Sequence, residues 1–376
     1  MRNIEMNINI KKIESSNNNI WDVYVYAHPD ATLYHLSGWK DVIEQTYGHK
    51  TYYLMAANSS SDSVAGIFPL VHLKHFLFGS SLISIPFFDI GGILAENEAV
   101  EKALLAEALK LGQKLKVKSI ELRQAQPLTW LAYSSNLSIN DQKNTPLSND
   151  LPALSHSIQS HKVRMLLELP DSSEVLMKSF KSKLRSQIKK PIKEGLAAKI
   201  GGAELINDFY QIFLVNMRDL GSPVHSKKII QNVLKIYQKT AKIVIVYRKN
   251  QPIAGSIMAG FRDTLENPWA SSLREYSRFS PNMLLYWTML EYACDNGFKR
   301  FDFGRSTPNE GTYKFKKQWG AKPEPLYWHY ISLNGKPLQQ GTSEKSKFEK
   351  AIRLWRKLPV TVTKTIGPMI RKHIGL

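Results

Sequence analysis

The chain has 376 residues, 43% of them hydrophobic, which suits roughly two or three packed domains and excludes a disordered or fibrous protein. The single cysteine, Cys294, excludes a disulfide framework and a zinc site built from paired thiolates. The formal net charge is +19, and it is uneven: residues 1–160 hold 13 Lys and Arg against 15 Asp and Glu, whereas residues 161–376 hold 38 against 17. The basic half predicts an anionic partner, namely nucleic acid, a nucleotide-linked substrate or a membrane surface, with simple solubility as the alternative.

The N-terminal residues 1–14 alternate Ile with Asn and Lys and lack the apolar core, about 7 to 15 residues long, of a signal peptide. No window reaches the roughly 18 apolar residues of a membrane span. We therefore expect a cytoplasmic protein.

The first half is predicted to contain strands, then a helix, then a strand. Apolar and aromatic runs predict strands over 51–57, 64–73 and 82–86. Apolar residues spaced by three and four predict a helix over 100–115, and 117–122 returns as a strand. This half is typical of a mixed α/β domain.

Residues 134–161 are rich in Ser, Asn, Asp and Pro and have no sustained period, which predicts a linker. We expect a first domain over 1–150 and a second, with the basic helix and the active site, over 151–340. A basic amphipathic extension is expected over 341–376.

The second half repeats the order of the first. Strands are predicted over 243–247, 253–261 and 269–276, and a helix begins at Ser280-Pro281, a capping residue followed by the residue type favoured at the first helical position. A strand over 298–303 follows. The repeated order predicts a weak internal duplication.

Several stretches resemble the Fem-type branch of the GNAT acyltransferase superfamily, whose members attach amino acids to peptidoglycan precursors, and related proteins found beside exopolysaccharide gene clusters. They are residues 84–92, 182–190, 217–225 and 301–306 with 313–320. The resemblance implies an α/β fold of tandem GNAT-like (acyl-CoA N-acyltransferase-like) domains, with mixed sheets flanked by helices. It also implies acyl or aminoacyl transfer onto an amine or hydroxyl of a nucleotide- or lipid-linked cell-envelope precursor, peptidoglycan or exopolysaccharide.

The same resemblance leaves the donor open between aminoacyl-tRNA and acyl-CoA, with no tightly bound cofactor and no metal. Coenzyme A users carry a glycine-rich loop at the helix that corresponds to residues 277–282, where this chain has no glycine and Pro281 removes one N–H. Many tRNA users carry a long helical hairpin, and no long stretch here has its unbroken period.

Asp302 is the first candidate for proton transfer. It lies between Phe301 and Phe303 on a predicted strand, so the two rings share one face and the carboxylate takes the other. A carboxylate beside aromatic rings can serve as a general base. The alternative is that Asp302 only pairs with Arg305 or caps a turn.

His225 is the second candidate. It follows the turn 221–223, which we expect to present the imidazole at the domain surface, where it titrates near neutral pH. Arg218 on the preceding helix is predicted to bind a phosphate. A satisfied turn residue and a solvated helix charge are the alternatives.

Arg305, Tyr313 and Lys316 follow the last strand, where open α/β sheets bind ligands. Arg offers a fork that matches phosphate and Lys a point charge, so we predict that they bind the acceptor's phosphate. A basic surface loop is the alternative.

Lys183 and Arg185 belong to a basic amphipathic helix predicted over 178–199 and ended or kinked by Pro191. We expect this helix to face the phosphates of tRNA or of a nucleotide-linked acceptor, or anionic lipid. A solvated helix face is the alternative.

The basic tail interleaves Lys and Arg with Ile352, Leu354, Trp355 and Leu358. This pattern predicts peripheral contact with the inner face of an anionic membrane, with packing across the second domain as the alternative. For the whole chain, the rival interpretations are a non-catalytic nucleic-acid-binding protein and a degenerate GNAT scaffold.

Overall fold

The chain folds as two compact units. The computed structural model describes residues 8–13, 18–59, 62–75, 79–133, 154–335 and 342–375. The boundary predicted near residue 150 and most of the predicted linker lie outside these ranges. The first unit comprises Met1–His161, Pro325–Gln340 and His373–Leu376, and the second comprises Lys162–Glu324 and Gly341–Lys372.

The described strands of the first unit form two sheets. They are β1 (Ile8–Lys12), β2 (Lys50–Thr51), β3 (Leu54–Asn58), β4 (Val64–Phe68), β5 (Val71–His75), β6 (Gly79–Ile83), β7 (Leu94–Ala95), β8 (Ser119–Gln124), β9 (Ser155–Gln159) and β17 (Tyr327–Ser332). The sheets run in the orders β1-β3-β4-β7 and β2-β5-β6-β8-β17-β9. Strand β17 pairs antiparallel with β8 and β9, so a segment that we placed with the second domain lies in a sheet of the first unit.

The helices of the first unit pack around these sheets. They are α1 (Asn18–Ala27), η2 (Leu33–His35), α2 (Gly38–Tyr47), α3 (Glu98–Lys114) and α4 (Thr129–Tyr133). The helix predicted over 100–115 is confirmed as α3, which begins after Asn97, whose side chain accepts the N–H of Val100. The strand predicted over 64–73 is divided into β4 and β5, with Pro69 between them, because proline cannot donate to a sheet ladder.

The second unit is built on one seven-stranded sheet in the order β11-β12-β13-β14-β15-β10-β16. Its strands are β10 (Val163–Glu168), β11 (Leu196–Gly201), β12 (Ala241–Arg248), β13 (Gln251–Phe261), β14 (Thr264–Ser272), β15 (Arg300–Ser306) and β16 (Lys322–Pro325). Strands predicted over 243–247, 253–261 and 298–303 are confirmed as β12, β13 and β15. Strands β14 and β15 are parallel, whereas β11 to β14, and β10 with β15, pair antiparallel.

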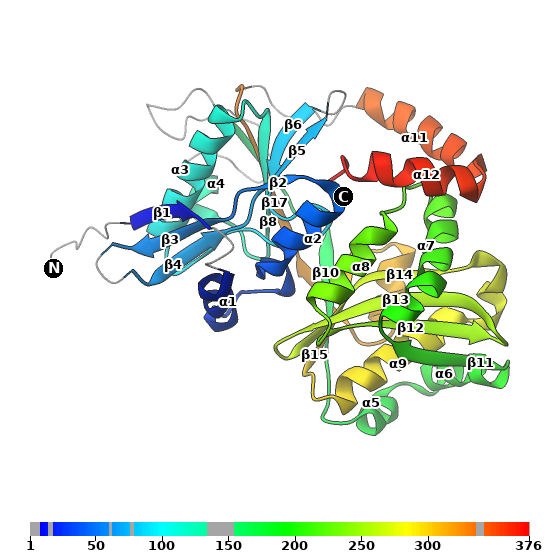
Figure 1. Ribbon diagram of the computed structural model, residues 1–376. Coiled ribbons are helices and arrows are strands. Elements are labelled where there is room, and N and C mark those ends of the chain that lie inside the picture. Colours follow the sequence, from blue (N-terminus) through cyan, green and yellow to red (C-terminus); the bar gives the residue numbers. More distant parts are fainter. Residues whose placement is uncertain are drawn as a thin grey trace. The chain divides into compact units, whose positions relative to one another are not determined.

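Helices cover both faces of this sheet. Figure 1 shows α7 and α8 on one face and α9, with α5 and α6, on the other. Helix α9 begins at Pro281, as predicted. The helices are α5 (Ser173–Ser179), α6 (Ser182–Lys193), η3 (Ala203–Leu205), α7 (Ile206–Leu220), α8 (Lys227–Ile236), η4 (Arg274–Phe279), α9 (Pro281–Asp295), α10 (Gly311–Lys317), α11 (Thr342–Lys357) and α12 (Val360–Arg371).

The basic helix predicted over 178–199 is wrong in its bounds. The segment contains the end of α5, the whole of α6 and part of β11. Pro191 lies inside α6 and does not end it, and Pro368 likewise lies inside α12. Proline removes one helical hydrogen bond, but Pro191 is buried, so packing against the core helps to offset that loss.

The core of the second unit lies between the sheet and α9. It contains the apolar side chains of α9, including the fully buried Leu285, together with Phe301 and Phe303 of β15. We predict that Leu285→Ala destabilises the second unit by about 2 to 5 kcal/mol because it leaves a cavity. Denaturant unfolding measures this change. Leu220→Ala, at an exposed position, is the matched control, and equal stability of the two variants would contradict this packing.

Candidate active site

Strands β14 and β15 run together only briefly. Their register pairs Thr264–Glu266 with Arg300–Asp302. Within the described chain no pairing between them follows, although β14 continues to Ser272 and β15 to Ser306. We call the segments 266–268 and 302–304 the divergence point.

A bulge in β14 contributes to this separation. The register between β13 and β14 passes from Ile257 opposite Trp269 to Ala259 opposite Glu266. Asn267 and Pro268 therefore lie opposite a single residue of β13, and two residues opposite one define a β-bulge. Pro268 also has no N–H to donate to a neighbouring strand.

A second bulge lies at the same level in β15. The register with β10 passes from Arg164 opposite Arg305 to Leu166 opposite Asp302, so two residues of β15 oppose one of β10. One of the two is Gly304, which has a φ of 74°. Glycine adopts this left-handed conformation without steric cost. The bulges bend both strands where they part.

Two buried acidic residues lie in register at the divergence point. Glu266 lies opposite Asp302 in the register, on the same face, and their residues are 4% and 6% exposed. Asp302 Oδ1 accepts the N–H of Gly304 at 2.7 Å, and Oδ2 lies 3.2 Å from Arg164 Nε. The ion-pair partner that the structure gives Asp302 is thus Arg164, whereas we had weighed Arg305. Arg164 also lies 4.0 Å from a carboxylate oxygen of Glu324.

Polar side chains also lie on the face of the divergence point toward α9. The amide of Asn267 donates to Ser256 Oγ and to the carbonyl of Ile257. Ser306 Oγ is buried and has no hydrogen-bond partner among the described residues. Buried polar groups are normally paired. Polar groups from three strands therefore collect around the ends of the paired segment.

Lys316 binds the main chain near the end of β15. Its ammonium is buried and donates to the carbonyls of Gly304, at 3.0 Å, and Arg305, at 2.7 Å. Arg305 is half-buried beside it. Tyr313 packs against the core, and the amine of Lys317 lies 5.9 Å from its ring centroid. Lys316 is thus directed at the main chain, which fixes the backbone beside the divergence point.

His225 is buried, and the expectation of a surface imidazole is wrong. The residue is 1% exposed, and Arg371 Nε donates to its Nε2 at 3.0 Å. Its ring meets that of Trp269 edge-on, with 5.9 Å between centroids. Burial, together with the guanidinium, holds the pKa of His225 well below its usual range. The imidazole is neutral at pH 7, and its proton is on Nδ1 because Nε2 accepts.

The remaining predicted residues, Arg218, Lys183 and Arg185, belong to α7 and α6. Arg218 Nε pairs with Asp219 at 2.7 Å. Lys183 is exposed on α6, and Arg185 donates to the carbonyl of Lys178 at 3.4 Å. The exposed lysines of α5, of α6 and of the two residues between them are Lys178, Lys181, Lys183, Lys189, Lys190 and Lys193.

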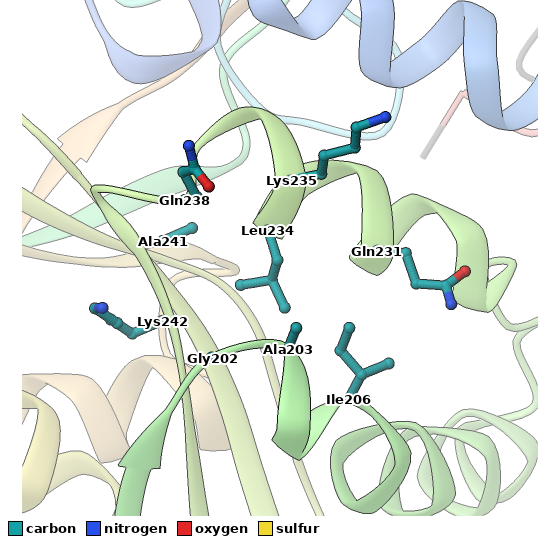
Figure 2. A pocket seen from close by; sticks show the side chains of 9 residues that line it. All are labelled: Gly202, Ala203, Ile206, Gln231, Leu234, Lys235, Gln238, Ala241 and Lys242. Atoms are coloured by element: carbon teal, nitrogen blue, oxygen red, sulfur yellow. The ribbon is translucent and has the colours of Figure 1, made fainter.

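A pocket of about 420 Å³ lies elsewhere in the second unit, between η3, α8 and β12 (Figure 2). The side chains of Leu234, Ala203 and Ile206 point toward one another inside it, whereas the amine of Lys235 and the amide of Gln231 point away. Ligand sites need convergent polar groups. The pocket also contains none of the predicted site residues, so the divergence point is the better candidate.

The second unit is similar to known acyltransferases over much of its length. A family model described as an acetyltransferase (GNAT) domain matches residues 178–317, which include both strands of the divergence point. Over these residues the chain is similar to the GNAT acetyltransferase family. A lipid II:glycine glycyltransferase from Staphylococcus saprophyticus is 32% identical over 99 residues, 24% of each chain, so the match spans about a quarter of that relative's length.

Two solved structures share the fold over most of the chain. The crystal structure of FemX has a TM-score of 0.64 at 16% identity, and a tandem GNAT protein from the clavulanic acid pathway has 0.51 at 10% identity. Each match covers 88% of this chain and 99% of the other. The predicted tandem GNAT-like fold and the resemblance to the Fem-type branch are confirmed.

The sequence did not reveal Glu266, Asn267 and Arg164. We expected a strand over 269–276, but β14 begins at Thr264 and ends at Ser272, so Glu266 is a strand residue opposite Asp302. The signal that could have located it is Pro268 within an apolar, aromatic run, because a strand tolerates proline at a bulge.

Within the described ranges, no helix combines the length and apolar character needed to cross a bilayer. In the same ranges, no three His, Cys, Asp or Glu side chains gather into a set that could hold a metal ion.

The ion pair between Arg164 and Asp302 is testable by a double-mutant cycle. Both side chains are nearly buried, so Arg164→Leu leaves a charge without its partner and should cost about 3 to 5 kcal/mol of unfolding free energy. The double variant Arg164→Leu/Asp302→Leu should recover most of this loss. Denaturant unfolding measures both, and losses that simply add would refute the coupling.

The burial of His225 predicts a pH dependence. It is the sole histidine of the second unit in the sequence. Because its pKa is lowered on folding, the unfolded chain binds a proton that the folded chain does not once the pH falls below about 6.5. The second unit should then lose about 1.4 kcal/mol per pH unit. Hydrogen exchange of β12 amides, corrected for intrinsic rates, measures this loss.

His225→Gln is the matched variant for that measurement, because its amide oxygen can accept from Arg371 but does not titrate. It should flatten the slope below pH 6.5. The same slope in both proteins would show that another group causes it.

Proposed function

We propose that this protein transfers an aminoacyl group from tRNA to an amine or hydroxyl of a nucleotide- or lipid-linked cell-envelope precursor. The observation that carries the proposal is the pair of buried carboxylates, Glu266 and Asp302, at the point where β14 and β15 of a GNAT domain separate. The local match to a lipid II:glycine glycyltransferase supports the acceptor class.

The reaction moves a proton from the attacking amine to the leaving ribose oxygen and needs no covalent enzyme intermediate. The acceptor's amine attacks the ester carbonyl carbon, a C–N bond forms, and the C–O bond to the tRNA ribose breaks. Asp302 accepts the proton of the attacking amine, and the released ribose hydroxyl receives a proton in return. Glu266 lies beside Asp302 and can relay that proton.

Other residues have supporting roles in this proposal. Arg164 orients Asp302, and Lys316 fixes the backbone of Gly304 beside it. Arg305 and Tyr313, next to the divergence point, bind the acceptor's phosphate. The buried imidazole of His225 accepts a hydrogen bond from Arg371 and packs edge-on against Trp269 of β14. In this proposal it positions the strand and does not accept the proton of the attacking amine.

Two features favour tRNA over acyl-CoA as donor. The start of α9 offers a poor cradle for a pyrophosphate, because Pro281 has no N–H and the preceding Ser280 has a φ of 56°. The exposed lysines of α6, with Lys183 and Arg185, form a surface suited to a phosphate backbone. Arg218 is paired with Asp219 and is not part of this surface.

A non-catalytic nucleic-acid-binding protein is the second candidate, and the same α6 lysines favour it. Two buried carboxylates would not contribute to a phosphate-binding surface, because both repel phosphate. The buried pair therefore favours the transferase.

The proposal predicts that Asp302→Asn lowers kcat by about 100-fold or more without weakening donor binding, because the base is lost. The assay follows labelled amino acid from charged tRNA into the precursor. Asp171→Asn is the control, since this exposed carboxylate pairs with Lys299 away from the divergence point. Glu266→Gln provides a second test, with folding of each variant checked by thermal melting. Full turnover by both folded variants would contradict the proposed roles of Asp302 and Glu266.

A further inference from the structure

The C-terminal helices α11 and α12 expose large apolar side chains. Leu354 of α11 is 67% exposed, and Met369 and Val362 of α12 are 63% and 39% exposed. Val362 and Met369 are seven residues apart and so share one side of their helix. We call these three residues the C-terminal apolar surface.

The two helices are held firmly while these side chains stay outside. Figure 1 shows α11 and α12 beside α7. Gly221 closely approaches Ile352, since an added Cβ would lie 2.5 Å from that side chain, and Gly367 similarly approaches Val224. Arg371 donates to the buried His225. The residues of α11 and α12 that pack against the rest of the second unit thus include Ile352, Gly367 and Arg371. Leu354, Val362 and Met369 stay exposed.

The charge around this surface is strongly positive. Residues 349–372 contain seven Lys and Arg against one acid, Glu349. The side chains of Lys350, Lys357 and Lys364 are exposed and form no ion pair with any described residue. Apolar side chains flanked by lysines are typical of helices that lie in the interface of an anionic bilayer.

Two other helices have one of these properties but not both. Helix α1 exposes Ile20 and Val23, at 52% and 69%, and its sequence contains no Lys or Arg. Helix α6 is rich in exposed lysines but exposes a single large apolar side chain, Ile192. A polyanion such as tRNA needs only charge, whereas a lipid surface rewards charge and apolar insertion together.

We propose that the C-terminal apolar surface docks the protein peripherally on an anionic lipid bilayer. Leu354, Val362 and Met369 enter the boundary between headgroups and acyl chains, and the flanking lysines meet the lipid phosphates. This interaction goes beyond the transfer reaction and does not depend on it, because binding to lipid is measured without donor or acceptor.

The test is flotation of the full chain with vesicles at physiological salt. Wild type should float with vesicles of phosphatidylglycerol and phosphatidylcholine and remain unbound with phosphatidylcholine alone. Leu354→Ser/Met369→Ser should weaken binding by about tenfold or more, because apolar insertion is lost. Lys350→Glu/Lys357→Glu should weaken it similarly and remove its salt dependence.

The matched control is Ile20→Ser/Val23→Ser, which makes the same kind of change at equally exposed positions of α1 and should leave binding unchanged. The proposal is overturned if wild type does not bind anionic vesicles, or if Leu354→Ser/Met369→Ser binds as wild type does. It is also overturned if Lys350→Glu/Lys357→Glu loses retention of tRNA while its vesicle binding is unaltered, because the surface would then serve nucleic acid.

Discussion

The separation of β14 from β15 is the structural constraint on which the proposed site of the second unit depends. A regular parallel pair would satisfy its main chain internally and leave no place for a reacting group. Pro268 and Gly304 each lie in a bulge at the same level of the sheet, and the ladder ends there. Glu266 and Asp302 are the last pair before the strands part, and this is the position that we propose for the donor's carbonyl.

The polar groups around this point hold one another in place. Arg164 pairs with Asp302, and Lys316 donates to the carbonyls of Gly304 and Arg305. On the other face of the sheet from α9, His225 and Arg371 tie the C-terminal helix α12 to the loop after α7. The helix that carries part of the proposed lipid contact is therefore anchored in the domain that carries the proposed site.

Local patterns in the sequence predicted much of this fold, and the errors have a common cause. The alternation of Phe301, Asp302 and Phe303 correctly placed both rings in the core and the carboxylate on the other face. Glu266 was missed because Asn-Pro after it is typical of a turn, whereas here it forms a bulge held by neighbouring strands. His225 was expected at the surface because its partner, Arg371, lies 146 residues further along the chain. Contacts between distant segments leave no local signal.

The most direct test of the account is the position of the aminoacyl group. An amide-linked, non-hydrolysable analogue of charged tRNA that carries a photoreactive aminoacyl side chain would be cross-linked to the protein and mapped by mass spectrometry. The account predicts cross-links to β14 and β15 around residues 266–268 and 302–304. Cross-links confined to the pocket between η3, α8 and β12, or to the first unit, would contradict it.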